Sequence, residues 1–342
     1  MTLRVASLGA GYFAQFQLEA WSRMARVDLV GIFDLDHVKA ELAAAKYDAE
    51  AYASLDALLD ATRPDILDIA VPPDGHAHAI TAGIDAGIGT IICQKPFCAS
   101  LDQARQMTKD AKAAGARLVI HENFRWQPWY RVMREAILQG RIGPPQNLTF
   151  RLRTGDGQGP QAYLDRQPYF QTMPRLLIHE TGVHWIDVFR FLMGAEPTAV
   201  YADLRKLNPV IAGEDAGHMI LDFETGARAL FDGNRLLDHN AAHPRLTLGE
   251  ACIEGSDGTL SLSGDGAVTF RAFGSRNAEW LLPAYDWQGF GGDCVYQLQL
   301  HVVAALLDDG PLENLADDYL SVRKTEIAAY RSAETGSKIA LT

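Results

Sequence analysis

Short apolar runs alternate with Ala-rich, helix-compatible segments along the first 120 or so residues. The helix-compatible segments occupy residues 13–24, 36–47, 55–62, 76–87 and 101–115. The β-rich runs lie before, between and after them, at 3–8, 27–33, 65–71, 89–94 and 116–124. Strand–helix alternation is typical of a parallel sheet covered by helices. The strands are almost continuously apolar, as burial on both faces requires. The pattern predicts an N-terminal α/β domain.

The pattern changes after Gly143-Pro144-Pro145. Alternating strand-like runs separated by turn signals such as Glu-Thr-Gly and Ser-Asp-Gly occupy residues 147–155, 198–207, 215–223, 227–237, 251–256, 258–264 and 267–273. Runs of this kind predict a mostly antiparallel sheet. Helices are expected at residues 176–189, 297–310 and 315–336. We therefore expect two domains, 1–122 and 123–342, and leave open whether the C-terminal helices pack back on the first domain.

Composition narrows the class of protein. A hydrophobic content of 48% in 342 residues is ample for a large core. The net charge of −12, without any run of Lys or Arg, argues against nucleic acid or an anionic membrane as a partner. The N-terminus lacks the pattern of a signal peptide, and no apolar stretch of about 18 residues occurs. The four cysteines have no C-x-x-C spacing, so we expect a cytoplasmic protein without a disulfide framework or a structural zinc site.

A glycine-rich turn follows the first predicted strand and opens the first predicted helix. It reads Gly9-x-Gly11-x-x-Ala14, and Asp34 ends the next strand, 25 residues after Gly9. In this context the glycines allow a tight turn close to a pyrophosphate, and the acid accepts a hydrogen bond from a ribose 2′-hydroxyl. No arginine closely follows Asp34, so NAD is favoured over NADP. The alternative is an ordinary βα turn.

Two further segments lie at the carboxyl ends of strands, where open α/β sheets bind ligands. Pro72 and Pro73 keep the first segment extended. His76 either contacts the cofactor or lies in the first turn of its helix without binding a ligand. The second segment is Gln94-Lys95-Pro96. A lysine at this edge is placed to bond a substrate oxygen and stabilise developing negative charge, although an exposed lysine often serves only solubility.

These motifs, taken in order, resemble the Gfo/Idh/MocA family of NAD(P)-dependent sugar and cyclitol oxidoreductases over essentially the whole chain. The quoted elements are Gly-Ala-Gly-Tyr-Phe-Ala, Asp34, Val-Pro-Pro-x-x-His76, Gln-Lys-Pro and Asn123-x-Arg125-x-x-Pro128. Two positions depart from the family pattern, because Gln94 replaces a glutamate and Glu180 an aspartate. The resemblance implies a Rossmann domain followed by an α/β domain whose large open, mostly antiparallel sheet forms homodimers or homotetramers.

The resemblance also assigns residues. It implies that His184 is the catalytic histidine and that Lys95 acts with it, supported by Glu180, Asn123 and Arg125. The residues expected to bind the cofactor are Gly9, Gly11, Tyr12, Phe13, Asp34, Pro72, His76, Gln94 and Lys95. Arg153 and Asp156 are expected to bind substrate hydroxyls. Trp126 either stacks on a sugar face or belongs to an interdomain core together with Trp129.

The stretch 176–189 contains two histidines, but it does not predict a metal site. At about 100° per residue of a regular helix, His179 and His184 lie about 140° apart, and the spacing is not H-E-x-x-H. Glu180 and His184 are four residues apart and share a face beside the apolar stripe of Trp185 and Val188. We expect His184 to act as a general base and His179 to be structural.

The expected function is NAD-dependent oxidation of a sugar hydroxyl, with a lactone as product if the carbon is anomeric. The combination of these segments most resembles the D-apiose dehydrogenase-like branch of the family. An inositol or cyclitol dehydrogenase and a sugar-ketone reductase remain alternatives within the fold. A non-catalytic NAD-binding regulator is the alternative of another class, and the presence of both Lys95 and His184 argues against it.

Overall fold

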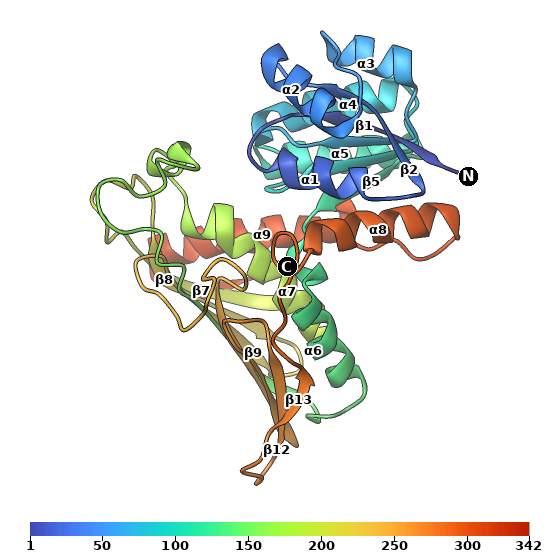
Figure 1. Ribbon diagram of the computed structural model, residues 1–342. Helices are drawn as coiled ribbons and strands as arrows, with labels where there is room; N and C mark the ends of the chain where they lie inside the picture. The colour runs from blue at the N-terminus through green and yellow to red at the C-terminus, as the bar shows by residue number, and fades with distance from the viewer. Residues whose placement is uncertain (342) are drawn as a thin grey trace. The chain divides into compact units, whose positions relative to one another are not determined.

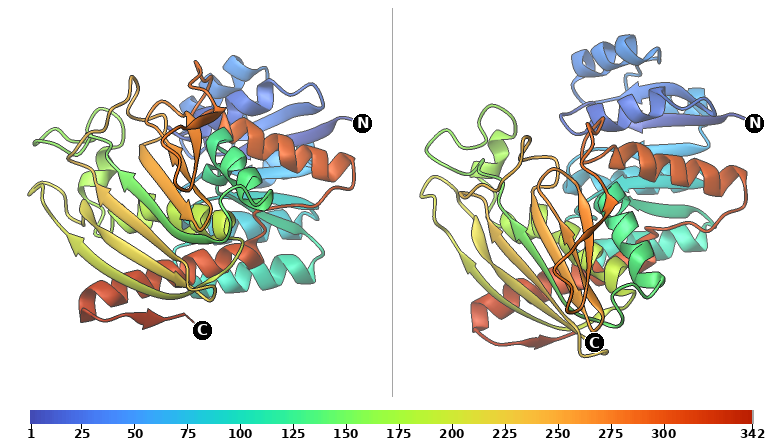
Figure 2. Two further views of the ribbon diagram at one scale, coloured as in Figure 1. Left: turned by 90° about the horizontal axis from the view of Figure 1, so that it is seen from below. Right: turned by 60° about the horizontal axis from the view of Figure 1, so that its bottom comes forward.

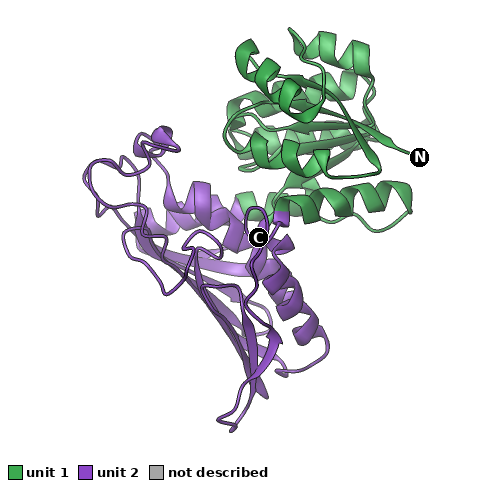
Figure 3. Cartoon of the chain, viewed as in Figure 1, with its two compact units in different colours: residues 1–123, 295–323 green, residues 124–294, 324–342 purple. Residues whose placement is uncertain are grey.

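The computed structural model describes residues 1–341, and its chain forms two compact units (Figures 1 and 3). The first unit consists of residues 1–123 and 295–323, and the second of residues 124–294 and 324–342. The sequence predicts a boundary after residue 122 and leaves open whether the C-terminal helices pack back on the first domain. In the structure the chain first passes from one unit to the other after residue 123, and residues 295–323 belong to the first unit. The division is discontinuous because compactness depends on packing and not on chain order.

The first unit is built on a five-stranded parallel sheet with the order β2-β1-β3-β4-β5. Every residue of β3 and β4 is buried, which agrees with the near-continuous apolar character of these runs. The strand order reverses beside β1, so the carboxyl end of β1 lies at the switch point where such sheets bind ligands. The strands are β1 (Leu3–Leu8), β2 (Val27–Phe33), β3 (Ile66–Ile69), β4 (Thr90–Gln94) and β5 (Arg117–His121).

Helices follow each of the first four strands of this sheet. Their bounds are α1 (Ala14–Ser22), α2 (His37–Tyr47), α3 (Leu55–Thr62), α4 (Pro73–Asp85) and α5 (Leu101–Ala113). Helices α2, α3 and α5 begin after Asp36, Ser54 and Ser100, whose side chains each accept a hydrogen bond from the backbone N–H three residues later. The predicted alternation is therefore confirmed. The unit is completed by α8 (Cys294–Leu307), from Val295 onward, and by the start of α9 (Ala316–Thr335), up to Arg323.

The second unit is built on a nine-stranded sheet that forms one twisted layer (Figure 2). Its pairs are antiparallel except for β6 and β9, so the predicted mostly antiparallel sheet is confirmed. In sheet order the strands are β13 (Glu279–Leu282), β12 (Val268–Ala272), β11 (Gly258–Leu262), β10 (Gly249–Gly255), β6 (Pro145–Leu152), β9 (Arg228–Asn234), β8 (Ala216–Phe223), β7 (Pro197–Arg205) and β14 (Ile339–Ala340). Neither β13 nor β14 was predicted; both are short edge strands.

Helices α6 (Pro128–Leu138) and α7 (Val183–Met193) pack against this sheet. Helix α6 was not predicted, although Pro128 at its first turn is a helix-start signal. The 3₁₀ turns η1 (Phe124–Trp126) and η2 (Pro168–Gln171) lie outside the sheet. The predicted helix at 176–189 begins as a π-helical segment, η3 (Leu177–Gly182), which continues into α7. The regular 100° rotation assumed from the sequence therefore does not apply to residues 177–182.

Over residues 1–341, no helix has the length and apolar character needed to cross a membrane.

Candidate active site

The glycine-rich turn joins β1 to α1 at the switch point of the parallel sheet. Gly9 has φ of +110°, and a Cβ there would lie 2.5 Å from the carbonyl oxygen of Ala70, so a side chain is excluded. In contrast, apart from Gly11 and its two chain neighbours, no atom of the described residues lies within 4 Å of a Cβ built on Gly11. The turn therefore has open space in front of Gly11, where a pyrophosphate fits against backbone and the start of α1.

Asp34 lies one residue beyond β2, next to this turn. Its carboxylate accepts hydrogen bonds from the N–H groups of Ala10 (2.7 Å) and Asp36 (2.8 Å). The turn and the acid are thus brought together, as the dinucleotide motif requires. Tyr12 and Phe13 follow Gly11, and Tyr12 is exposed and packs edge-on against Phe16. Taken together, these features fit a bound dinucleotide.

His76 lies in the first turns of α4 and is completely buried. Its Nε2–H donates to the carbonyl of Val71 (2.9 Å), and its Nδ1 accepts from the N–H of Cys98 (3.2 Å). These partners fix the neutral tautomer, and burial lowers the pKa of the ring to about 4. The ring thereby joins the Val71-Pro72 segment after β3 to the segment after β4. This geometry favours the interpretation in which His76 does not touch the cofactor.

Gln94 and Lys95 lie at the carboxyl end of β4. The Gln94 Oε1 accepts from the backbone N–H of Lys95 (2.7 Å), which fixes the amide. Within residues 1–341, the buried Nε2 of Gln94 has no hydrogen-bond partner. Because an unsatisfied buried donor is costly, this amide fits a ligand acceptor at the sheet edge, such as a group of NAD. The Lys95 side chain is partly exposed at the same edge.

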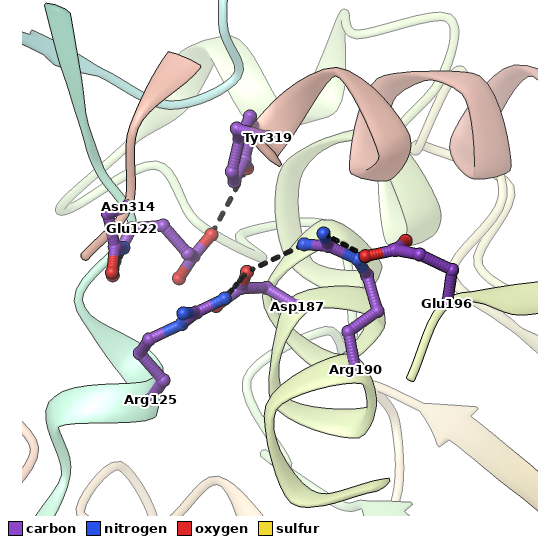
Figure 4. A network of polar contacts seen from close by, with 7 residues as sticks. All are labelled: Glu122, Arg125, Asp187, Arg190, Glu196, Asn314 and Tyr319. Carbon is purple, nitrogen blue, oxygen red and sulfur yellow. Dashed lines mark hydrogen bonds and ion pairs between the residues drawn. The ribbon is translucent and has the colours of Figure 1, made fainter. Parts of the chain in front are cut away.

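The end of β5, next to Asn123, is fixed by groups that the sequence analysis did not identify (Figure 4). The carbonyl of Glu122 accepts from the side-chain amide of Asn314 (2.6 Å), and the Glu122 carboxylate accepts from the hydroxyl of Tyr319 (3.2 Å). Glu122 and Asn123 are both buried. Only the unusual position of an acid directly after an apolar strand could have drawn attention to Glu122.

In the second unit, η3 is fixed at its start by Glu214. The carbonyl of Glu214 accepts from the N–H of Leu177 (3.1 Å), and its carboxylate accepts from the N–H of Ile178 (3.1 Å). The Nδ1 of His179 contacts the carboxylate of Glu326 at 2.5 Å. His179 thus takes part in a side-chain network of the second unit. Among residues 1–341, no group of three or more His, Cys, Asp or Glu side chains could hold a metal ion.

Glu180 lies on η3, four residues before His184. Its carboxylate accepts from the hydroxyl of Thr181 (2.8 Å), and that hydroxyl accepts from the buried guanidinium of Arg235 (2.7 Å). Arg235 also donates to the hydroxyl of Tyr163 (2.8 Å) and to Asp156 (3.2 Å). Arg235, on the chain just after β9, was not identified from the sequence, because no local pattern distinguishes it from a solvated arginine.

Asp156 and Arg153 both take part in ion pairs of the second unit. Arg166 also donates to Asp156 (2.9 Å). Burial acts to raise the pKa of the Asp156 carboxyl, but the positive charge of Arg235, together with the charge of Arg166 and the hydrogen bonds to this carboxyl, outweighs this effect and holds the pKa below its usual value. Arg153 donates to the carboxylate of Asp232 (2.5 Å) and to backbone carbonyls. A role for either in binding substrate hydroxyls stays a prediction.

Arg125 is joined to α7 by a two-pronged ion pair (Figure 4). Its Nε and Nη2 donate to the carboxylate of Asp187 at 2.7 and 2.5 Å. Arg190 also contacts Asp187 (3.4 Å) and pairs with Glu196. Asp187 is almost completely buried. It was not identified from the sequence as the partner of Arg125, because the two residues are 62 positions apart in the sequence.

The aromatic side chains after Asn123 are mostly enclosed. One face of Trp126 is covered by the guanidinium of Arg131, 3.5 Å from the ring centroid. Trp129 is fully buried, donates to the Gln127 side chain (2.9 Å) and packs edge-on against Trp287. Trp129 is a core residue of the second unit. Stacking of Trp126 on a sugar stays a prediction.

Comparison with known proteins identifies the relatives of this chain. Residues 3–122 match the model described as the oxidoreductase family with NAD-binding Rossmann fold, and residues 130–261 match the GFO/IDH/MocA C-terminal domain. A D-apiose dehydrogenase of Paraburkholderia graminis is 30% identical over 98% of this chain and 89% of the relative. An inositol 2-dehydrogenase of Rhizobium meliloti is 30% identical over 69% of each.

A solved structure is also similar over nearly its full length. It is an oxidoreductase of Agrobacterium radiobacter in complex with NAD⁺, L-tartaric acid and magnesium, with a TM-score of 0.90, 26% identity and coverage of 99% of this chain and 98% of that one. Both halves of the chain thus match, and the cofactor is NAD. This chain belongs to the Gfo/Idh/MocA family and is an NAD-dependent oxidoreductase of the class that acts on the CH–OH groups of sugars and cyclitols.

Proposed function

We propose that this protein oxidises the anomeric hydroxyl of a small aldose such as D-apiose to the lactone. The observation that carries the proposal is the 30% identity to a D-apiose dehydrogenase across nearly the whole of both chains. A second D-apiose dehydrogenase, from Rhizobium rhizogenes, is 29% identical over 98% of this chain. Similarity that extends through the second unit supports a related substrate, since that unit carries the expected sugar-binding residues.

The proposed chemistry assigns separate tasks to His184 and Lys95. His184 takes the proton of the substrate hydroxyl as general base, a task that suits an imidazole near neutral pH. Lys95 hydrogen-bonds the same oxygen and stabilises the negative charge that develops on it. NAD, when bound, supplies the hydride acceptor. The Gln94 amide, with its buried Nε2, would contribute a hydrogen bond to the cofactor.

The remaining predicted residues would bind and orient the sugar. Glu180, connected to Arg235 through Thr181, would accept from a sugar hydroxyl. Asn123 and Trp126 would contact the sugar directly. Arg125 would act mainly by fixing α7, because Asp187 already engages its guanidinium.

Oxidation of a cyclitol is the second candidate. The inositol 2-dehydrogenase relative has the same percentage identity, although over a smaller share of the chain. The two candidates differ in product, because an anomeric carbon gives a lactone and a cyclitol carbon gives a ketone.

We also propose assembly into a homodimer or homotetramer through the large sheet, in the cytoplasm. The strand face opposite to the core side carries half-buried apolar side chains, including Tyr201, Ile220 and Leu230. The four cysteines are free, in keeping with a reducing compartment. Sedimentation of the protein, compared with an Ile220→Glu variant, tests the assembly, and a monomeric wild-type protein would contradict it.

The decisive experiment is a screen of free aldoses and cyclitols, with formation of NADH followed by absorbance. We expect the highest kcat/KM with a small aldose and expect NMR of the product to identify a lactone. A ketone as product, or turnover restricted to cyclitols, would replace the first candidate with the second. Absence of turnover with every compound would contradict both.

A further inference from the structure

The ring of Phe124 lies flat against the ring of His184. Their centroids are 3.7 Å apart and their planes differ by 3°. Both side chains are nearly enclosed, with exposed fractions of 3% for Phe124 and 5% for His184. Aromatic pairs more often adopt edge-to-face or offset arrangements, so a close parallel stack on a histidine requires an explanation.

The surrounding contacts fix this stack from two sides. Arg125, the next residue of η1, binds the carboxylate of Asp187, three residues after His184 on α7. Phe124 also packs edge-on against Trp185 (5.3 Å), and Trp185 in turn stacks on Phe150 of β6 (4.2 Å). The ion pair and the aromatic contacts therefore hold η1 and the first turn of α7 in one arrangement, with one face of the imidazole covered.

We propose that Phe124 is a positioning residue for the general base, and that its π face stabilises the imidazolium that His184 becomes when it accepts the substrate proton. The inference rests on the proposed function of His184. In the step concerned, the O–H bond of the substrate breaks, the proton bonds to a ring nitrogen of His184, and the electron pair remains on oxygen. Phe124 exchanges no atoms or electrons.

The physical basis is the quadrupole of the phenyl ring. Its face is electron-rich and attracts a cation, and this attraction is larger where water is excluded. A neutral imidazole gains much less, so the stabilisation increases as the proton is transferred and acts mainly on the transition state. Glu180 and Asp187 are the charged residues nearest to His184 along its own segment, and Arg125 follows Phe124 in the sequence. Alterations confined to the Phe124 ring leave all three unchanged.

Site-specific replacement of Phe124 by mono-, di- and trifluorophenylalanine tests the proposal. Fluorination withdraws electron density from the ring face while nearly preserving its shape. We expect the NMR titration midpoint of the His184 ring, identified by comparison with His184→Ala, to fall stepwise, by about one pH unit for the trifluoro ring. We also expect kcat to fall by about tenfold, with the acid limb of the kcat/KM profile moving to lower pH.

The direction of the shift separates this effect from loosened packing. A gap that admitted water would favour the charged ring and move the midpoint to higher pH. Fluorination of Phe150, which stacks on Trp185, is the matched control and should leave the titration and kcat unchanged. The thermal midpoint reports any general loss of stability.

Each outcome is decisive. The proposal is overturned if the titration midpoint of His184 does not change with fluorination of Phe124. It is also overturned if the midpoint shifts while kcat is unchanged. If His184→Ala retains wild-type kcat, the proposed role of His184 as the base fails. The titration in the substrate-free and cofactor-free protein then still shows whether the stack stabilises the charged ring.

Discussion

Two buried ionisable groups of the first unit, Asp68 and His76, should have opposite effects on stability between pH 7 and pH 5. Asp68 is fully enclosed in β3 and accepts hydrogen bonds from the indole N–H of Trp21 (2.7 Å) and the side chain of Gln17 (3.2 Å). Burial raises the pKa of Asp68 to about 7 and lowers the pKa of His76 to about 4. Both groups are therefore held mainly neutral inside the fold at pH 6.

The signs follow from proton uptake in the two states. His76 has an unfolded-state pKa of 6.5, above its folded value, so the unfolded state gains the proton first and stability falls as pH decreases from 6.5 towards 4. Asp68 has an unfolded-state pKa of 3.8, below its folded value, so the folded state gains the proton and stability rises as pH decreases from 7 towards 4. From pH 7 to pH 5, each contribution amounts to about 2 kcal/mol, and the two nearly cancel.

Single substitutions should reveal the separate contributions of Asp68 and His76 to the pH dependence of stability. Asp68→Asn keeps an acceptor for Trp21 but removes the ionisation, so this variant should lose about 2 kcal/mol more than wild type between pH 7 and pH 5. His76→Asn keeps an acceptor for the Cys98 N–H, and it should gain about 2 kcal/mol relative to wild type over the same range. The free energy of unfolding of each cofactor-free protein, measured in urea at pH 5, 6 and 7, gives these differences. Differences from wild type that stay constant with pH would refute the reasoning.

Three further predictions concern the chemistry. The protein should bind NAD at least about tenfold more tightly than NADP, because the Asp34 carboxylate would repel a 2′-phosphate, and equal affinities in calorimetric titrations would remove Asp34 from this role. His184→Ala should lower kcat by about 10²–10⁴ with little change in NAD affinity, whereas a collapsed melting transition would identify His184 as a core residue. Lys95→Met should lower kcat at least about a hundredfold, and steady-state rates within a few fold of wild type would mean that Lys95 is an ordinary solvated lysine.

Local patterns in the sequence were sufficient for the two sheets and for the dinucleotide turn. Apolar runs of strand length alternate with helix-compatible segments in the first unit, and the periodicity changes to alternating strands in the second. Both signals act over a few residues, since they reflect which side of an element is buried. The turn at Gly9 and Gly11 and its proximity to Asp34 could be predicted in the same way, because a tight turn and the end of the next strand are both defined locally.

Only the tertiary structure determined which side chains distant in the sequence are in contact. Phe124 and His184 are 60 positions apart in the sequence, and Arg125 and Asp187 are 62 apart, yet each pair is in contact. The π-helical form of η3 and the membership of residues 295–323 in the first unit also depend on distant packing partners. Periodicity along the chain determines which face of an element is buried. It does not determine which other element covers that face, because that choice is made by shape, charge and hydrogen bonding once the whole chain has packed.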